Sequence, residues 1–197
     1  MRKQIIEITG PPGCGKTTLI NNHNQGYKVY KGFCPDSYTA LKRQLISIFK
    51  IIVLPFTFRL NYTKFKWLLQ KTYTYPESFF HKANALRNAF LKFTLTPSSE
   101  KIIVDEGISH IPFILQLSDK DIDEFIVLFS NVLKCKTIVL VSPPDRQELE
   151  RRLTMRGHKR ATSQERLEKI VSENLRVYKT YKKLLAYYSI PYQSDLQ

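Results

Sequence analysis

The chain has 197 residues, of which 43% are hydrophobic and 24% charged, so its length suits one domain with a real core. This composition argues against wholesale disorder, a fibrous repeat and a disulfide-rich miniprotein. Its 31 Lys and Arg against 17 Asp and Glu give a formal charge of +14, which attracts phosphate carried by a nucleotide, a nucleic acid, a phosphosugar or an anionic lipid.

Three short runs rich in β-branched residues, 4–9, 101–104 and 137–141, predict strands, and the first is followed at once by glycine and proline. Residues 27–30 predict a second, weaker strand. Helical patterns lie between them. Strands that alternate with helices favour an α/β three-layer sandwich with a parallel sheet.

Two amphipathic patterns predict long helices in the C-terminal half of the chain. Apolar residues recur at helical spacing over 121–133, and Ser118 is a start signal for that helix. A second apolar stripe runs over 165–187, where Thr162 and Glu165 match a capping box.

Residues 37–99 interrupt this alternation with an aromatic, mostly helical pattern. Residues 40–95 contain ten Lys or Arg and one acid, so this insertion carries most of the excess charge. Basic and aromatic residues around Trp67 resemble a surface that binds nucleic acid, although packing of the aromatics on the core is favoured. The apolar run 49–60, with its flanking bases, suits an anionic membrane surface, but a buried helical hairpin is favoured.

Three cysteines, Cys14, Cys34 and Cys135, show neither pairing nor metal-ligand spacing, which is typical of free thiols in a reducing compartment. The N-terminus lacks the apolar stretch of a secretory signal, and the run 51–58 is too short to span a membrane. We therefore expect a cytoplasmic protein without a transmembrane segment.

Residues 10–17 match the phosphate-binding pattern G-x-x-x-x-G-K-[ST] in full, between a predicted strand and a predicted helix. Glycines let successive backbone amides turn toward phosphate oxygens, and the helix adds its positive end. We expect the nucleotide to bind along Gly10, Pro11, Pro12, Gly13, Cys14, Gly15, Lys16, Thr17 and Thr18. Lys16 is expected to reach the β- and γ-phosphates, Thr17 to bind Mg²⁺, and Thr18 to reach the α-phosphate.

An acidic pair, Asp105 and Glu106, follows the predicted strand 101–104. This strand delivers the pair to the carboxyl edge of the sheet, where ligands bind in open α/β folds. Asp105 is placed to hold Mg²⁺ directly or through water, and Glu106 to act as a general base or to orient water. A cap for a helix over 108–117 is an alternative role for Asp105, and the two roles are compatible.

A basic segment, residues 151–162, follows the fourth predicted strand and a helix. Arg152 and Arg156 are four residues apart and share a helix face. Guanidinium groups stabilise the charge of a transferring phosphoryl group, and a mobile loop can close over it. We expect this role of Arg156 and Arg160, whereas Arg151 is typical of a solvated helix end.

These three motifs, in this order, resemble those of P-loop kinases of the nucleoside and nucleoside-monophosphate kinase type, thymidylate-kinase-like in the broad sense. Such enzymes carry a Walker A loop, an acidic motif after a central strand, and an arginine-bearing LID. Their helical acceptor-binding region falls where residues 37–99 lie. The resemblance implies a single P-loop kinase-like domain over 1–197, with helical insertion 37–99 and a LID-like segment 151–162.

The acidic motif departs from this family. Thymidylate kinases carry Asp-Arg after the central strand and deoxynucleoside kinases Glu-Arg, whereas Asp105 is followed by Glu106 and Gly107. The arginine that contacts an acceptor phosphate is missing, which weakens the case for a monophosphate acceptor. Asp36 lies near the position of the family's general base, but a helix cap is its favoured role.

The sequence therefore predicts an ATP- and Mg²⁺-dependent kinase that phosphorylates a small-molecule acceptor such as a nucleoside, a nucleotide or a sugar. Positioning and electrostatics would supply most of the catalysis, with Lys16, Glu106, Arg156 and Arg160 as the catalytic groups. The alternative is a nucleotide-binding NTPase module whose basic insertion, residues 40–95, binds nucleic acid or an anionic membrane.

Overall fold

The computed structural model describes residues 5–23, 25–30, 62–74, 88–89, 101–157 and 163–194. Five parallel strands form one sheet in the order β2-β3-β1-β4-β5. Their bounds are Ile5–Thr9 for β1, Lys28–Tyr30 for β2, Ile102–Asp105 for β3, Thr137–Leu140 for β4 and Tyr192–Gln193 for β5. The predicted α/β fold with a parallel sheet is confirmed.

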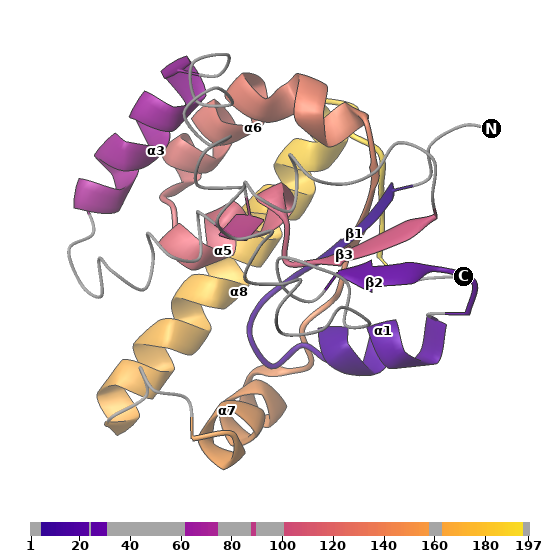
Figure 1. Ribbon diagram of the computed structural model, residues 1–197. Helices are drawn as coiled ribbons and strands as arrows, with labels where there is room; N and C mark the ends of the chain where they lie inside the picture. The colour runs from indigo at the N-terminus through magenta and orange to yellow at the C-terminus, as the bar shows by residue number, and fades with distance from the viewer. Residues whose placement is uncertain are drawn as a thin grey trace, which may run out of the picture.

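Helices cover both faces of this sheet (Figure 1). Their bounds are Lys16–His23 for α1, Tyr62–Thr74 for α3, Ile108–His110 for the short η1, Ile111–Leu115 for α5, Asp119–Lys134 for α6, Arg146–Met155 for α7 and Gln164–Tyr187 for α8. Alternate residues of β1, Ile6 and Ile8, pack with Ile20 of α1 on one face. On the other face, Ile138 and Leu140 of β4 pack into the larger core formed with α5, α6 and α8.

The two long helices begin where polar side chains cap them. Ser118 Oγ accepts a hydrogen bond from the Asp121 amide at 3.2 Å, so the predicted start of α6 is confirmed. At α8 the capping-box prediction is wrong, because Ser163 Oγ caps the helix by accepting from the Arg166 amide at 3.3 Å. Thr162 lies outside the described residues.

The described part of the insertion is α3 with residues 88–89, and α3 packs on α6. Trp67 donates its indole N–H to Glu124 Oε2 at 3.0 Å, and Lys71 pairs with Asp121. Leu68 is buried in the core. These contacts turn Trp67 and Lys71 toward acids of the same molecule, as the packing role favoured above predicts, whereas Tyr62 and Lys66 are exposed.

Several sequence predictions fall on parts of the chain that the structure does not describe. These are the apolar run 49–60, Cys34, Asp36 and Arg160. Within the described residues, no helix has both the length and the apolar character needed to cross a bilayer.

Candidate nucleotide-binding site

The turn between β1 and α1 requires glycine where it meets the surrounding elements. Gly10 has a φ of 148°, and a Cβ there would lie 2.7 Å from the Val141 carbonyl oxygen at the end of β4. Gly13 has a φ of 84°, and a Cβ there would lie 3.0 Å from Leu149 Cδ1 of α7. Neither position accommodates a side chain without displacing its neighbours. The loop is therefore held closely between β4 and α7.

Lys16, the first residue of α1, directs its ammonium back into this loop. Its Nζ donates to the carbonyl oxygens of Gly10 at 2.9 Å and Pro11 at 3.0 Å. The same atom lies 3.3 Å from Glu106 Oε1. The lysine is buried, so oxygen atoms of the protein satisfy its charge. The loop and the acidic motif thus meet at one ammonium group.

The register of the sheet places the acidic pair beside the start of the loop. Asp105 pairs with Ile8 across β3 and β1, and the Glu106 amide donates to the Ile8 carbonyl at 3.1 Å. Glu106 has a φ of 54°, which turns the chain sharply after the strand. The helical turn that follows is capped by Gly107, so Asp105 does not cap it and that alternative is wrong.

The donor set fits Mg²⁺. Thr17 presents an exposed hydroxyl at the start of α1, and Asp105 ends β3 beside the loop. Mg²⁺ prefers such hard oxygen ligands and takes the rest from water and substrate phosphates. In the described parts of the chain, no group of three or more His, Cys, Asp and Glu is arranged to hold a metal ion.

Helix α7 contributes a guanidinium group to the loop. Arg152 Nη1 donates to the Gly13 carbonyl at 3.2 Å, and its Nε donates to Glu148 Oε1 at 2.7 Å. Arg151 donates to the same carboxylate at 2.6 and 2.8 Å. The hydrogen bonds from Arg151 and then Arg152 lower the pKa of Glu148 to about 2. Glu148 therefore stays ionised and orients both arginines at the edge of the loop.

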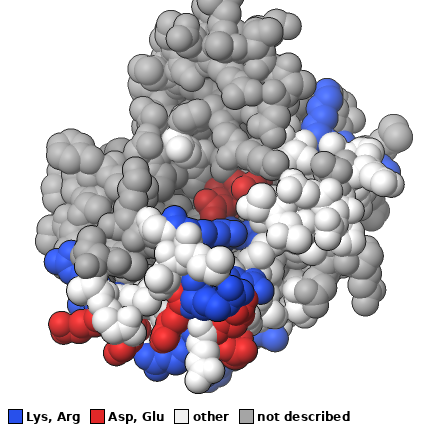
Figure 2. All heavy atoms as spheres, turned by 90° about the horizontal axis from the view of Figure 1, so that it is seen from below, with Lys and Arg blue, Asp and Glu red and all other residues white. Residues whose placement is uncertain are grey.

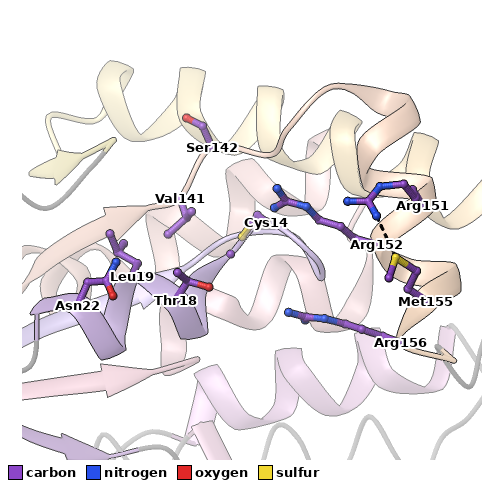
Figure 3. Close-up of a pocket in the computed structure, with 11 residues that line it drawn as sticks. Cys14, Thr18, Leu19, Asn22, Val141, Ser142, Arg151, Arg152, Met155 and Arg156 are labelled. Carbon is purple, nitrogen blue, oxygen red and sulfur yellow. Dashed lines mark hydrogen bonds between the residues drawn. The ribbon is translucent and has the colours of Figure 1, made fainter.

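A pocket of about 740 Å³ opens between the loop, α1, the end of β4 and α7. Its lining consists of Cys14, Gly15, Thr18, Leu19, Asn22, Val141, Ser142, Arg151, Arg152, Met155 and Arg156. Arg152 and Arg156 extend from α7 toward Cys14 and Thr18, whereas Arg151 turns to the sulfur of Met155 (Figure 3). This volume lies within the usual range of small-molecule sites.

Charged side chains of both signs are interspersed on the face of the molecule that carries α7 (Figure 2). The arginines of α7 alternate with acids there: Arg146 pairs with Glu150, and Arg151 and Arg152 both pair with Glu148. Arg156, the C-cap residue of α7, lines the pocket. Its guanidinium group therefore adds positive charge to the wall of the pocket.

The sequence interpretation gave Arg152 no role, and the structure places it on the loop itself. Its four-residue spacing from Arg156 was the available signal. The structure brings Lys16 and Glu106 together at the loop and places Arg156 in the lining of the pocket. Burial raises the pKa of the Cys14 thiol, partly offset by the charge on Lys16, so Cys14 is an unreactive wall of the pocket.

Glu148 provides a pH test of this geometry. Its pKa is lowered from 4.5 to about 2, so its pairs with Arg151 and Arg152 are fully present above pH 4.5 and are lost as the pH falls through about 2. A carboxyl ¹³C NMR titration should show a midpoint near 2 in the native protein. In the double variant Arg151→Ala/Arg152→Ala the midpoint should return toward 4.5, and an unchanged midpoint would contradict the pairing.

Two comparisons with known proteins find no relative: no protein-family model matches the chain, and no curated protein matches it. Among solved structures, the chain is similar to one described as "Structure of deoxyadenosine kinase from M.mycoides with bound dATP". The two share 18% identity over 98% of this chain and 90% of that chain, with a TM-score of 0.42.

Proposed function

We propose that the protein is a kinase that transfers the γ-phosphoryl group of ATP to a small-molecule acceptor. One observation carries this proposal: a buried lysine in a glycine-rich strand-to-helix loop lies 3.3 Å from a carboxylate at the end of the neighbouring strand. An arginine-lined pocket adjoins the same loop. These parts supply phosphate binding, a proton acceptor and charge stabilisation within one site.

The triphosphate would take over the contacts that Lys16 now makes within the loop. Ionised phosphate oxygens are stronger acceptors than the neutral carbonyls of Gly10 and Pro11, which favours the exchange. Thr17 and Asp105 would hold Mg²⁺, which when bound neutralises charge on the phosphates. The base and ribose would occupy the pocket beside α1 and α7.

In the transfer step, the acceptor hydroxyl oxygen forms a bond to the γ-phosphorus while the bond from that phosphorus to the bridging oxygen of ADP breaks. Glu106 would take the hydroxyl proton, because its half-exposed carboxylate is open to an acceptor and lies beside the lysine proposed to bind the phosphates. Arg156 would stabilise the charge on the transferring group, and Arg160, from a segment outside the described residues, would join it.

The local charges favour one kind of acceptor. Asp105 and Glu106 present two carboxylates at the end of β3. A second phosphate held against them would be repelled, whereas a hydroxyl would be attracted as a hydrogen-bond donor. We therefore favour a nucleoside or a sugar over a nucleotide as the acceptor.

The test is transfer of label from [γ-³³P]ATP with Mg²⁺ to a panel of nucleosides, nucleotides, phosphosugars and polyols. Label on one class of acceptor is the expected result. Release of free phosphate with no labelled acceptor would contradict the kinase proposal and favour the NTPase alternative. In that case, binding of RNA or anionic vesicles through residues 40–95 should weaken steeply with salt.

Arg152 and Arg151 form a matched pair of variants for the pocket. Arg152 lies on the loop, where its guanidinium group would donate to a phosphate of the bound ATP. Arg152→Ala would remove this charge-assisted hydrogen bond and the contact with Gly13, and it should weaken ATP binding by about 10- to 100-fold. Arg151→Ala removes the same charge from the same helix but leaves Arg152 in place, and a change of about twofold is expected. Titration calorimetry measures the Kd of both variants for ATP. Equal losses of affinity would show that Arg152 has no specific role in binding.

A further inference from the structure

A charged side chain, Glu7, lies in the middle of β1, the central strand of the sheet, where the other residues are Ile or Thr. Its carboxylate is buried and pairs with the buried ammonium of Lys136. Burying two charges carries a large desolvation cost, and two apolar residues of similar volume are often at least as stable. Stability alone therefore does not account for a carboxylate at this place.

The Glu7 carboxylate contacts the turn that follows Glu106. Its Oε1 accepts a hydrogen bond from the Ser109 amide, while its Oε2 pairs with Lys136. A Cβ on Gly107 would lie 2.5 Å from Glu7 Cδ and 2.6 Å from Oε1. The chain between Glu106 and Ser109 thus passes directly over the carboxylate, which leaves no space for a side chain at Gly107.

Glu106 itself has a backbone conformation that a non-glycine residue adopts only at a cost. Its φ of 54° lies in the left-handed region, and such a residue persists where its surroundings fix it. Contacts on both sides of Glu106 do so. Its own amide donates to the Ile8 carbonyl at 3.1 Å, and the Ser109 amide donates to Glu7. Because Glu7 and Ile8 are neighbours in β1, both ends of the turn are attached to the same strand.

We propose that Glu7 is a positioning residue: by accepting the hydrogen bond of the Ser109 amide, it fixes the turn that directs the Glu106 carboxylate to the acceptor hydroxyl. This inference rests on the proposed kinase function. Glu7 is 1% exposed, so it acts through Glu106 and not by contact with a substrate. Lys136 supplies the counter-charge for the buried carboxylate.

Two double variants separate this role from the stability of the ion pair. Both remove the two charges, but Glu7→Gln/Lys136→Met keeps an oxygen acceptor for the Ser109 amide, whereas Glu7→Leu/Lys136→Met removes it. We expect the first to keep kcat within about threefold and the second to lower it by about tenfold or more, because a displaced base is a poor one. The Kd for ATP should stay unchanged in both, because Lys16 is intact. Label transfer at saturating ATP and acceptor measures kcat, and titration calorimetry measures the Kd.

The coupling to Glu106 is the second readout. Once Glu106 is replaced in Glu106→Gln, the change Glu7→Leu/Lys136→Met should lower kcat no further, because the group that the turn directs is gone. A merely structural role of Glu7 would lower kcat in both backgrounds. Equal kcat for the two double variants, or additive losses in this cycle, would overturn the positioning role.

Gly107→Ala tests the same contact from the side of the turn, should the leucine variant fail to fold. Its methyl group would meet the Glu7 carboxylate and displace the turn, so kcat should fall by about tenfold or more. Gly26→Ala is the control, because a Cβ there would meet no atom within 4 Å, and it should leave kcat unchanged. A Gly107→Ala variant with the kcat of the wild type would also overturn the role.

Amide hydrogen exchange keeps this inference apart from the kinase proposal. The amides of Glu106 and Ser109 should exchange about tenfold faster or more in Glu7→Leu/Lys136→Met than in Glu7→Gln/Lys136→Met. If the wild type transfers label and the two double variants have the same kcat, only the role of Glu7 fails. If the wild type labels no acceptor, the kinase function fails, and the exchange rates still show whether Glu7 fixes the turn.

Discussion

Replacing Lys16 by alanine is expected to lower kcat for phosphoryl transfer by at least about 100- to 1,000-fold, the loss typical of one preorganised charged donor at a transition state. The ammonium is the point at which Gly10, Pro11 and Glu106 meet, so no neighbouring group takes its place. The measurement is label transfer from ATP under saturating acceptor.

The fold should survive this change. The change removes two hydrogen bonds to neutral carbonyls, and the Glu106 carboxylate left behind is half-exposed to water. We expect the free energy of unfolding to fall by about 1–2 kcal/mol, measured by urea denaturation. Lys169→Ala, an exposed lysine on α8, is the control and should leave both quantities unchanged. A Lys16→Ala variant with half of the wild-type kcat would refute the site.

The second large effect is on stability and comes from a buried ion pair under the acidic motif. Lys136→Met should lower the free energy of unfolding by about 3–5 kcal/mol, because it leaves the buried carboxylate of Glu7 without this counter-charge. Lys136 pairs with Glu7 Oε2, and their side chains are 5% and 2% exposed. The other carboxylate oxygen accepts from the Ser109 amide. Glu7 also affects Tyr181: the burial of the tyrosine, and then the negative charge on Glu7, raise the pKa of the Tyr181 hydroxyl well above its usual value.

Glu7→Gln/Lys136→Met is the matched control for this prediction. A neutral pair of similar volume should recover most of the lost stability, since a buried ion pair contributes little over an uncharged replacement. Urea denaturation of the wild type, both single variants and the double variant completes the cycle. A loss below about 1 kcal/mol for Lys136→Met would show that Glu7 does not depend on Lys136.

The turn that carries Asp105 and Glu106 packs directly against the ion pair of Glu7 and Lys136. A Cβ on Gly107 would lie 2.5 to 2.8 Å from the atoms of the Glu7 carboxylate, so the chain after Glu106 passes against Glu7. The Lys136 variant should therefore lower activity through a displaced Glu106 as well as through lost stability. Kinetics normalised to the folded fraction separate these two effects.

The sequence predicted the elements that local patterns encode. Short β-branched runs predicted β1, β3 and β4, a weaker pattern predicted β2, and Ser118 predicted the start of α6. The glycine spacing of residues 10–17 predicted a strand-to-helix loop, because a backbone that turns so tightly accepts no side chain at Gly10 or Gly13. The start of α8 was misjudged by one residue, since Thr162 and Ser163 are both good caps and adjacent.

Only the tertiary structure decided which side chains meet across the site. Arg152 contacts Gly13, Lys136 contacts Glu7, and His110 contacts Thr9, over 139, 129 and 101 residues of sequence. No periodicity or spacing in the sequence predicts such contacts. They arise from the parallel register of β1, β3 and β4 and from the packing of α7 on the loop. Residue types within a short window determined the loop and the strands, whereas the order of strands in the sheet determined the partners of its charged groups.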